Sequence, residues 1–183
     1  MMDNKEKDIL QAAENMVRAG GYNAFSFRDI ANAVGIKSSS VHYHFPTKED
    51  LGAAVAVYYT ETFLSALGEP EDLVKAHKDP IEIYIKAFKE ALTKDKRMCL
   101  CGLLGAEVKG LPPKVAAQTK VFFERNIDWL ISAYTLQGCK EDVRAKAIQT
   151  LSLLEGAMIT SHALDDIHVF DAIESLLNRD KHP

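Results

Sequence analysis

The residues best suited to bind another molecule are concentrated in GIKSSSVHYHFPTKEDL, which spans residues 35 to 51. This segment contains two histidines, a tyrosine and three serines, and Lys37 and Lys48 lie near its two ends. Serine hydroxyls are short enough to let a helix approach base edges, and lysine ammonium groups neutralise phosphates. Lys48 also stands at the start of a helical pattern, where unpaired amides and the helix dipole favour an anion. The composition of the segment therefore indicates contact with DNA.

Two short helices are expected to carry this segment. The first covers residues 27–34, with Ser26 as its cap and Gly35 at its end. The second should begin at a Ser38 cap and close at Phe45, because the proline that follows disfavours helix in the residue before it. Two short helices with glycine at the turn form a helix-turn-helix, whose second helix can enter the major groove.

The rest of the chain also shows helical spacing of apolar residues, so the sequence predicts an all-α fold. The other expected helices cover residues 4–19, 48–67, 80–95, 98–109, 113–136, 141–163 and 167–178, with a short extra helix near 70–77. Thr47 and Asp50 form a capping-box pattern at the start of the long helix 48–67. We expect this helix to join an N-terminal three-helix DNA-binding domain, residues 1–46, to a larger helical domain, residues 47–183.

Composition limits the class of protein. With 183 residues and 47% hydrophobic content, the chain can bury a core, which excludes a disordered or fibrous protein. Because the net charge is −4, any contact with DNA must be local. The charged N-terminal sequence does not resemble a signal peptide, and no apolar run approaches the roughly 20 residues of a membrane span, so we expect a cytoplasmic protein without membrane contact.

The segment GIKSSSVHYHFPTKEDL resembles the N-terminal signature of the TetR/AcrR family of bacterial transcriptional repressors: a glycine, an apolar residue, small polar residues, an aromatic- and histidine-rich end, phenylalanine, a turn and Lys-Glu. The upstream GGYNAFSFRDIANAVGI resembles the family's second helix, and together the likeness covers about the first 55 residues. His42 stands where members commonly have tyrosine, and Ser39 where they often have glycine. The resemblance implies that Tyr43, His44 and Lys48 lie near the phosphate backbone and that residues 37–42 contact bases. The predicted DNA-binding residues are Arg28, Lys37, Ser38, Ser39, Ser40, His42, Tyr43, His44, Thr47 and Lys48.

The resemblance further implies that residues 47–183 form an effector-binding and dimerisation domain. It implies a homodimer held by a four-helix bundle, with a small-molecule pocket beside the C-terminal half of the helix 48–67. We expect helices 113–136 and 143–162 to supply the bundle, with an ordinary intrachain core as the alternative. Their apolar stripes contain Val115, Phe122, Trp129 and Leu130, and Ala147, Leu151, Leu154 and Met158.

Two DNA-binding domains related by a two-fold axis predict a palindromic operator, with half-sites separated by about one helical turn. A ligand against the long helix could change this spacing, so we expect a repressor that a small-molecule inducer releases from double-stranded DNA. The predicted effector-binding residues are Tyr58, Thr62, Phe63, Phe88, Cys99, Leu103, Glu107, Phe122, Trp129 and His162.

Three cysteines, Cys99, Cys101 and Cys139, are too few for a disulfide framework. On a helix, Cys99 and Cys101 point about 200° apart and cannot easily bridge each other. The segment MCLCGLLGAEVKGLPP also resembles a subset of the family that regulates detoxification of unsaturated or electrophilic compounds and carries a cysteine at this helix start. A cysteine-based electrophile or redox sensor on the same repressor scaffold therefore stays open, beside two thiols buried in a core.

No catalytic, metal or cofactor site is expected. The sequence has no GxSxG, HExxH, P-loop or GxGxxG pattern, so a small helical thiol enzyme is a remote alternative. His77, Glu107, Glu155 and His162 could meet as metal ligands or as polar anchors in a ligand pocket, but nothing in their spacing shows that they do. A helical protein-binding module is a third interpretation, which leaves residues 35–51 without a role. The effector, the operator, the regulated genes, the direction of regulation and the number of dimers per operator stay open.

Overall fold

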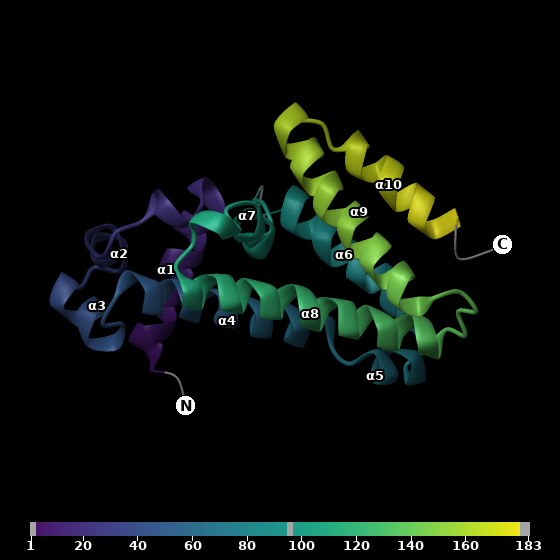
Figure 1. Cartoon of the computed structure of the whole chain (residues 1–183), viewed down its shortest axis with the longest axis horizontal. Coiled ribbons are helices and arrows are strands. Elements are labelled where there is room, and N and C mark those ends of the chain that lie inside the picture. The colour runs from purple at the N-terminus through teal and green to yellow at the C-terminus, as the bar shows by residue number, and fades with distance from the viewer. Residues whose placement is uncertain (1–2, 95–96, 180–183) are drawn as a thin grey trace. The chain divides into compact units, whose positions relative to one another are not determined.

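The computed structural model describes residues 3–94 and 97–179. Figure 1 shows its helices: α1 (Asn4–Gly20), the 3-10 helix η1 (Tyr22–Ala24), α2 (Phe27–Val34), α3 (Ser38–His44), α4 (Lys48–Leu67), α5 (Pro70–Lys75), α6 (Pro80–Thr93), α7 (Leu100–Ala106), the 3-10 helix η2 (Val108–Gly110), α8 (Pro113–Leu136), α9 (Val143–Leu164) and α10 (His168–Arg179). No strand occurs among the described residues, and the prediction of an all-α fold is confirmed. Within the same residues, no helix is both long and apolar enough to cross a membrane.

Two local expectations differ from the structure. The helix expected over 98–109 is divided into α7 and η2, because Glu107 lies between them with φ −92° and ψ 3°, outside regular helix. Ser38 is not a cap: it is already the first helical residue of α3, and Lys37 occupies the N-cap without a side-chain hydrogen bond. The amides at the start of α3 therefore have no side-chain cap and face the surface that Ser38 and Lys37 expose.

The chain divides into two compact units, each built from two stretches of sequence. Unit 1 contains the chain up to Thr62 together with Leu100–Phe123. Unit 2 contains Phe63–Cys99 together with the chain from Glu124 onward. The three-helix domain expected over residues 1–46 is therefore only part of unit 1.

In unit 1, local sequence signals set the ends of α2 and α4. Ser26 and Asp29 form a capping box: the Asp29 amide donates to Ser26 Oγ at 3.3 Å, and the Ser26 amide donates to Asp29 Oδ2 at 2.9 Å. Gly35 ends α2 in the left-handed conformation, with φ 73°. Thr47 caps α4 in the same way, since its Oγ1 accepts from the Asp50 amide at 3.1 Å. The buried core of the unit includes Ile9, Leu10, Ala13, Val17, Ile30, Val41, Phe45, Leu51, Val55 and Phe122.

The later stretch of unit 1 is joined to the earlier one by specific contacts. The backbone amide of Lys114, at the start of α8, donates to Glu49 Oε1 at 3.0 Å. The Lys114 ammonium lies 2.6 Å from Asp50 Oδ1. Gly52 of α4 allows a close approach, because a Cβ there would lie 2.6 Å from the Tyr22 ring and 3.1 Å from Val115. The start of α8 is therefore an integral part of this unit.

Unit 2 is a helical core capped by aspartates. Asp79 accepts hydrogen bonds from the amides of Ile81 and Glu82 at the start of α6, and Asp142 caps α9 in the same manner. Its buried side chains include Ile81, Tyr84, Ile85, Phe88, Cys99, Trp129, Leu130, Ala133, Leu151, Leu154, Met158 and Phe170.

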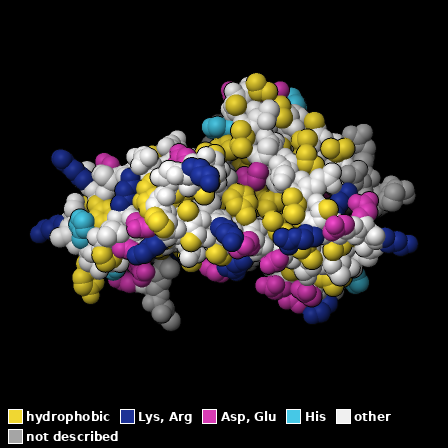
Figure 2. All heavy atoms as spheres, in the orientation of Figure 1, with side chains coloured by type: hydrophobic (Ala, Val, Ile, Leu, Met, Phe, Trp, Pro, Cys, Tyr) yellow, Lys and Arg dark blue, Asp and Glu magenta, His cyan; other side chains and the backbone are white. Residues whose placement is uncertain are grey.

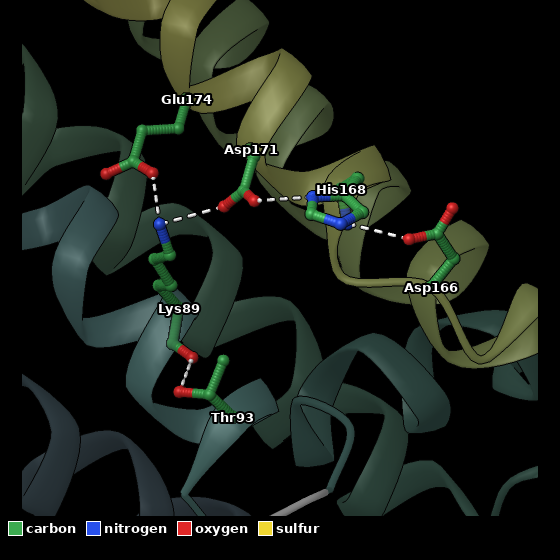
Figure 3. Close-up of polar contacts among 6 residues, drawn as sticks. All are labelled: Lys89, Thr93, Asp166, His168, Asp171 and Glu174. Carbon is green, nitrogen blue, oxygen red and sulfur yellow. Dashed lines mark hydrogen bonds and ion pairs between the residues drawn. The ribbon is translucent and has the colours of Figure 1, made fainter.

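A polar cluster connects α6 to α10 within unit 2, and Figure 3 shows it in detail. The Lys89 ammonium lies 2.6 Å from Glu174 Oε2 and 2.9 Å from Asp171 Oδ1. Asp171 also lies 3.3 Å from the His168 ring one turn earlier. These ion pairs raise the pKa of Lys89 and lower the pKa of Asp171, so both of these side chains are charged near neutral pH.

The stripes expected to form the dimer interface are buried within the chain. Val115, Phe122, Trp129 and Leu130 of α8 are at most 7% exposed, and so are Ala147, Leu151, Leu154 and Met158 of α9. The Trp129 indole also donates to the backbone carbonyl of Gly68 at 2.8 Å. These side chains fill the intrachain core, which was the alternative that the periodicity left open, so the predicted interface is wrong in those residues.

Candidate nucleic-acid interface

The polar face of α3 is presented to solvent because the opposite face is buried. Val41 is 0% and Phe45 5% exposed, which fixes α3 against the core of unit 1. Tyr43 is 84% exposed, although large aromatic side chains are usually covered. We call the ten predicted DNA-binding residues the recognition surface; all are exposed except Ser40, His44 and Lys48, which are half-buried.

His42 and Phe27 meet at the junction of the two short helices. Their rings lie edge to face, with centroids 4.4 Å apart. Because Phe27 is the first residue of α2, this contact joins the middle of α3 to the start of α2. Arg28, the next residue of α2, is exposed beside it. The Phe27–His42 contact therefore sets how α2, which carries Arg28, is seated against α3.

Lys48 is held in place by two aromatic rings. Its ammonium lies 4.6 Å from the centroid of Phe25 and 4.9 Å from that of Tyr22. Burial lowers the pKa of Lys48, and the nearby Asp29 carboxylate partly opposes this change. The rings restrict where the ammonium can lie, so a phosphate contact here would cost less side-chain entropy than one to a loose lysine. Sequence reasoning found Lys48 and missed Tyr22 and Phe25, which precede it by more than 20 residues.

A shallow hollow of about 300 Å³ lies beside α3. It is lined by Asp3, Lys5, Ser39, Ser40, Tyr43 and His44. Lys5, at the start of α1, thus adds a cation next to the serines of the recognition surface. Sequence reasoning missed this lysine, because nothing in the pattern of α1 separates it from ordinary surface charge. Figure 2 shows lysine or arginine side chains and a histidine projecting at the end of unit 1 that carries α2 and α3.

The side chains predicted to line an effector pocket are divided between the two units. Phe88, Cys99, Phe122 and Trp129 are buried; Tyr58, Phe63 and Leu103 are half-buried; Thr62, Glu107 and His162 are exposed. Within unit 2, Phe63, Phe88 and Trp129 gather around Tyr84, which sequence reasoning did not select. In unit 1, Phe122 instead lies against Tyr59, with centroids 5.8 Å apart. The structure therefore brings three of the ten residues into one aromatic cluster.

Glu107 has a defined partner in unit 1. One of its oxygens accepts a hydrogen bond from the backbone amide of Tyr22 at 3.0 Å. Its carboxylate also lies directly over Gly21, where a Cβ would contact it and where φ is +80°. Only glycine suits that position for both reasons. Glu107 thus fastens the end of α7 to the turn that carries Tyr22, the aromatic partner of Lys48.

The cysteines and histidines form no metal site within the described part of the chain. No group of three histidine, cysteine or acidic side chains that could hold a metal occurs there. Cys99 and Cys101 are 2% and 0% exposed, and neither is in a disulfide. His162 and His77 are both exposed.

The polar face of α3 is exposed, its apolar face is buried, and a glycine turn joins it to the short helix α2. This is the arrangement of a helix-turn-helix DNA-binding protein. Residues 9–55 match the family model described as bacterial regulatory proteins, tetR family. The whole chain is similar to a TetR transcriptional regulator from Legionella pneumophila, at 34% identity over 98% of both chains and a TM-score of 0.87. It is also similar to a TetR-family transcriptional regulator from Agrobacterium tumefaciens, at 32% identity over 96% of both chains and a TM-score of 0.84.

The chain therefore belongs to the TetR family of transcriptional regulators, and its first helices form a helix-turn-helix DNA-binding domain. A more distant match shares the fold alone. The transcriptional regulator FadR from Bacillus subtilis, in complex with stearoyl-CoA, is 15% identical over 93% of this chain and 96% of FadR, with a TM-score of 0.67.

Proposed function

We propose that this protein is a cytoplasmic, ligand-responsive transcriptional repressor that binds a palindromic operator as a homodimer and is released by a small-molecule inducer. The observation that carries the proposal is the recognition surface, on which exposed Tyr43 and ring-held Lys48 lie at the two ends of the α3–α4 junction. Its relatives are transcriptional regulators, and this supports a regulatory role rather than an enzymatic one. FadR's complex with stearoyl-CoA supports response to a small molecule by the same fold.

The proposed dimer uses the outward faces of α9 and α10 in unit 2. Four large apolar side chains are exposed there: Ile148 at 41%, Ile159 at 49%, Leu164 at 64% and Leu176 at 38%. Exposed apolar residues close together commonly mark a protein interface. Ile148, Ile159 and Leu164 lie on α9 and Leu176 lies on α10, and all four are outside the buried core of unit 2, so a partner could cover them without disturbing that core. The expectation of a homodimer is thus kept, with different residues.

The operator test compares variants in a fluorescence-anisotropy titration against DNA taken from beside the gene. Tyr43→Ala and Lys48→Ala should each weaken specific binding, whereas Lys75→Ala removes the same charge from the exposed α5 and should not. Losing one phosphate contact in each half-site should also reduce the slope of log K against log salt by about 1.8 for Lys48→Ala. Equal operator affinity of all four proteins would contradict the assigned recognition surface.

The dimer test is sedimentation of Ile159→Lys. A lysine within the proposed interface should give a monomer and lose operator binding. Val74→Lys, at a similarly exposed apolar position on α5, is the matched control and should remain dimeric. If Ile159→Lys is still a dimer, the interface lies elsewhere.

A second candidate function is favoured by one contact in unit 2. Burial raises the pKa of the Glu155 carboxyl, and the nearby Cys99 thiol partly opposes this change. An ionised carboxylate beside a thiol can act as a general base, accepting the thiol proton as the sulfur attacks an electrophile. An electrophile sensor would release operator DNA after treatment with N-ethylmaleimide, and Cys99→Ser would not respond while Cys139→Ser would. Release that persists in Cys99→Ser would exclude this residue as the sensor.

A further inference from the structure

Glu155 is the least expected side chain in the core of unit 2. It lies in α9 between Leu154 and Gly156 and is 7% exposed. Both carboxylate oxygens are enclosed, and neither makes a hydrogen bond of ordinary geometry to the described residues. A buried carboxylate without a partner is costly, because its solvation is lost and nothing replaces it. A carboxylate in this position is stabilised either by a bound ligand or by taking up a proton, which removes its charge.

Two titratable groups neighbour the Glu155 carboxylate, and neither is a cation. Burial, followed by the nearby Glu155 carboxylate, raises the pKa of Tyr84, whose hydroxyl donates to Asn126 Oδ1 at 2.7 Å. The Cys99 thiol is the other titratable neighbour. Burial is the main cause that raises the pKa of Glu155 to about 7, and no lysine, arginine or histidine in the described part of the chain contributes to it. Residues 3–94 and 97–179 therefore supply no cation for this carboxylate.

One aromatic residue, Tyr84, neighbours the carboxylate. Tyr84 is the centre of a cluster with Phe63, Phe88 and Trp129. Its ring centroid lies 5.8 Å from that of Phe63, 5.3 Å from Phe88 and 5.2 Å from Trp129. Aromatic faces attract cations, and the attraction is stronger where water is excluded. A carboxylate and several rings together suit an organic cation and disfavour an anion.

We infer that Glu155 and this aromatic cluster recognise the cationic group of an organic effector, such as a protonated amine. This inference rests on the proposed function, since it assigns the chemical class of the inducer. Tyr84 and Phe88 are 0% and 2% exposed, so an entering ligand must displace ring side chains. A ligand that must rearrange the core binds the two arrangements of the protein with different affinity, which is what induction requires.

The test uses three probes of similar size: 2-phenylethylamine as the cation, 2-phenylethanol as the neutral analogue and 3-phenylpropanoate as the anion. Trp129 is the only tryptophan, so its fluorescence reports binding at the cluster. At about pH 8 the wild type should bind the amine roughly tenfold more tightly than the alcohol, and the anion least. Glu155→Gln keeps the size of the side chain and should bring amine and alcohol to about equal affinity. Glu82→Gln, an exposed glutamate of α6, is the control and should keep the preference.

Proton competition gives an independent readout. Lowering the pH from about 8 to about 6 protonates Glu155, so the amine should bind roughly tenfold more weakly while the alcohol is unaffected. An amine that fails to bind at millimolar concentration, or whose advantage over the alcohol survives in Glu155→Gln, overturns the inference. Operator binding is measured separately. If the protein binds its operator but not the amine, only this inference is contradicted. If it binds no operator, the proposed function is contradicted.

Discussion

Replacing Glu155 with glutamine should stabilise the protein against unfolding, by an amount that grows as the pH rises. The carboxyl has a pKa of about 7 in the folded protein against 4.5 for the exposed group. Between these values the unfolded chain has lost the proton that the folded chain still holds, so a rising pH favours unfolding and removes stability. The full difference corresponds to about 3 kcal/mol, of which about 2.5 kcal/mol develops between pH 5 and pH 8. Glutamine does not titrate, so the variant avoids this loss.

The assay is urea unfolding of wild type and Glu155→Gln at pH 5 and pH 8, followed by Trp129 fluorescence at one fixed protein concentration. All other titrating groups are common to both proteins, so their contributions cancel in the difference between the two free energies of unfolding. The free energy of unfolding of Glu155→Gln should rise relative to that of the wild type by about 2.5 kcal/mol between pH 5 and pH 8. Glu82→Gln should show no such movement, because its carboxylate is exposed.

A constant difference between wild type and Glu155→Gln would refute the reasoning. It would mean that the folded protein holds the carboxylate ionised at an ordinary pKa, which requires a partner or solvent that the structure does not place there. The cation-recognition inference would lose its physical basis in the same experiment.

Three further perturbations test other contacts. Glu107→Ala removes the carboxylate that accepts the hydrogen bond from the Tyr22 amide. A buried hydrogen bond to a charged group is worth about 1.5–3 kcal/mol, and this partly exposed one is worth less, so operator affinity in the anisotropy titration should fall. Unchanged affinity would show that this contact does not order the domain. Gly52→Ala would force a methyl into the Tyr22 ring and should lower stability by about 1–3 kcal/mol in thermal unfolding, whereas an unchanged midpoint would show that the ring moves aside readily. Lys89→Met should cost about 1 kcal/mol or less in urea unfolding, because the ion pairs are about one-third exposed; a much larger loss would mean that they are effectively desolvated.

Local signals allowed much of unit 1 to be predicted. The capping patterns at Ser26 and Thr47 are confirmed because a cap involves residues only three apart, which the sequence displays directly. Val41 and Phe45 are four residues apart, a spacing that puts them on one side of a helix, and both are buried. The serine at 38 failed as a cap because three serines in a row offer several starting points for a helix, and the backbone selects Lys37.

Features that depend on distant residues could not be predicted. The stripe that contains Trp129 has the same period whether it covers the chain's own core or a partner, so spacing could not decide between them. Glu155 has the residue type of a solvated side chain, and only packing shows that it is enclosed. Glu107 and the amide of Tyr22 are 85 residues apart, and neither carries a local sign of the other.

The discontinuous make-up of unit 1 has a consequence for biosynthesis. Its helix-turn-helix is complete in the nascent chain once α3 has emerged, but Glu107, Lys114 and Phe122 complete the unit only when residue 123 has been added. At bacterial elongation rates of 5–20 residues per second, translating the interval from residue 62 to 123 takes roughly 3–12 s. During that time the surfaces of α1 and α4 that later meet α7 and α8 are uncovered, and the nascent chain presents them to chaperones. A fragment that ends after α4 would keep those surfaces exposed permanently.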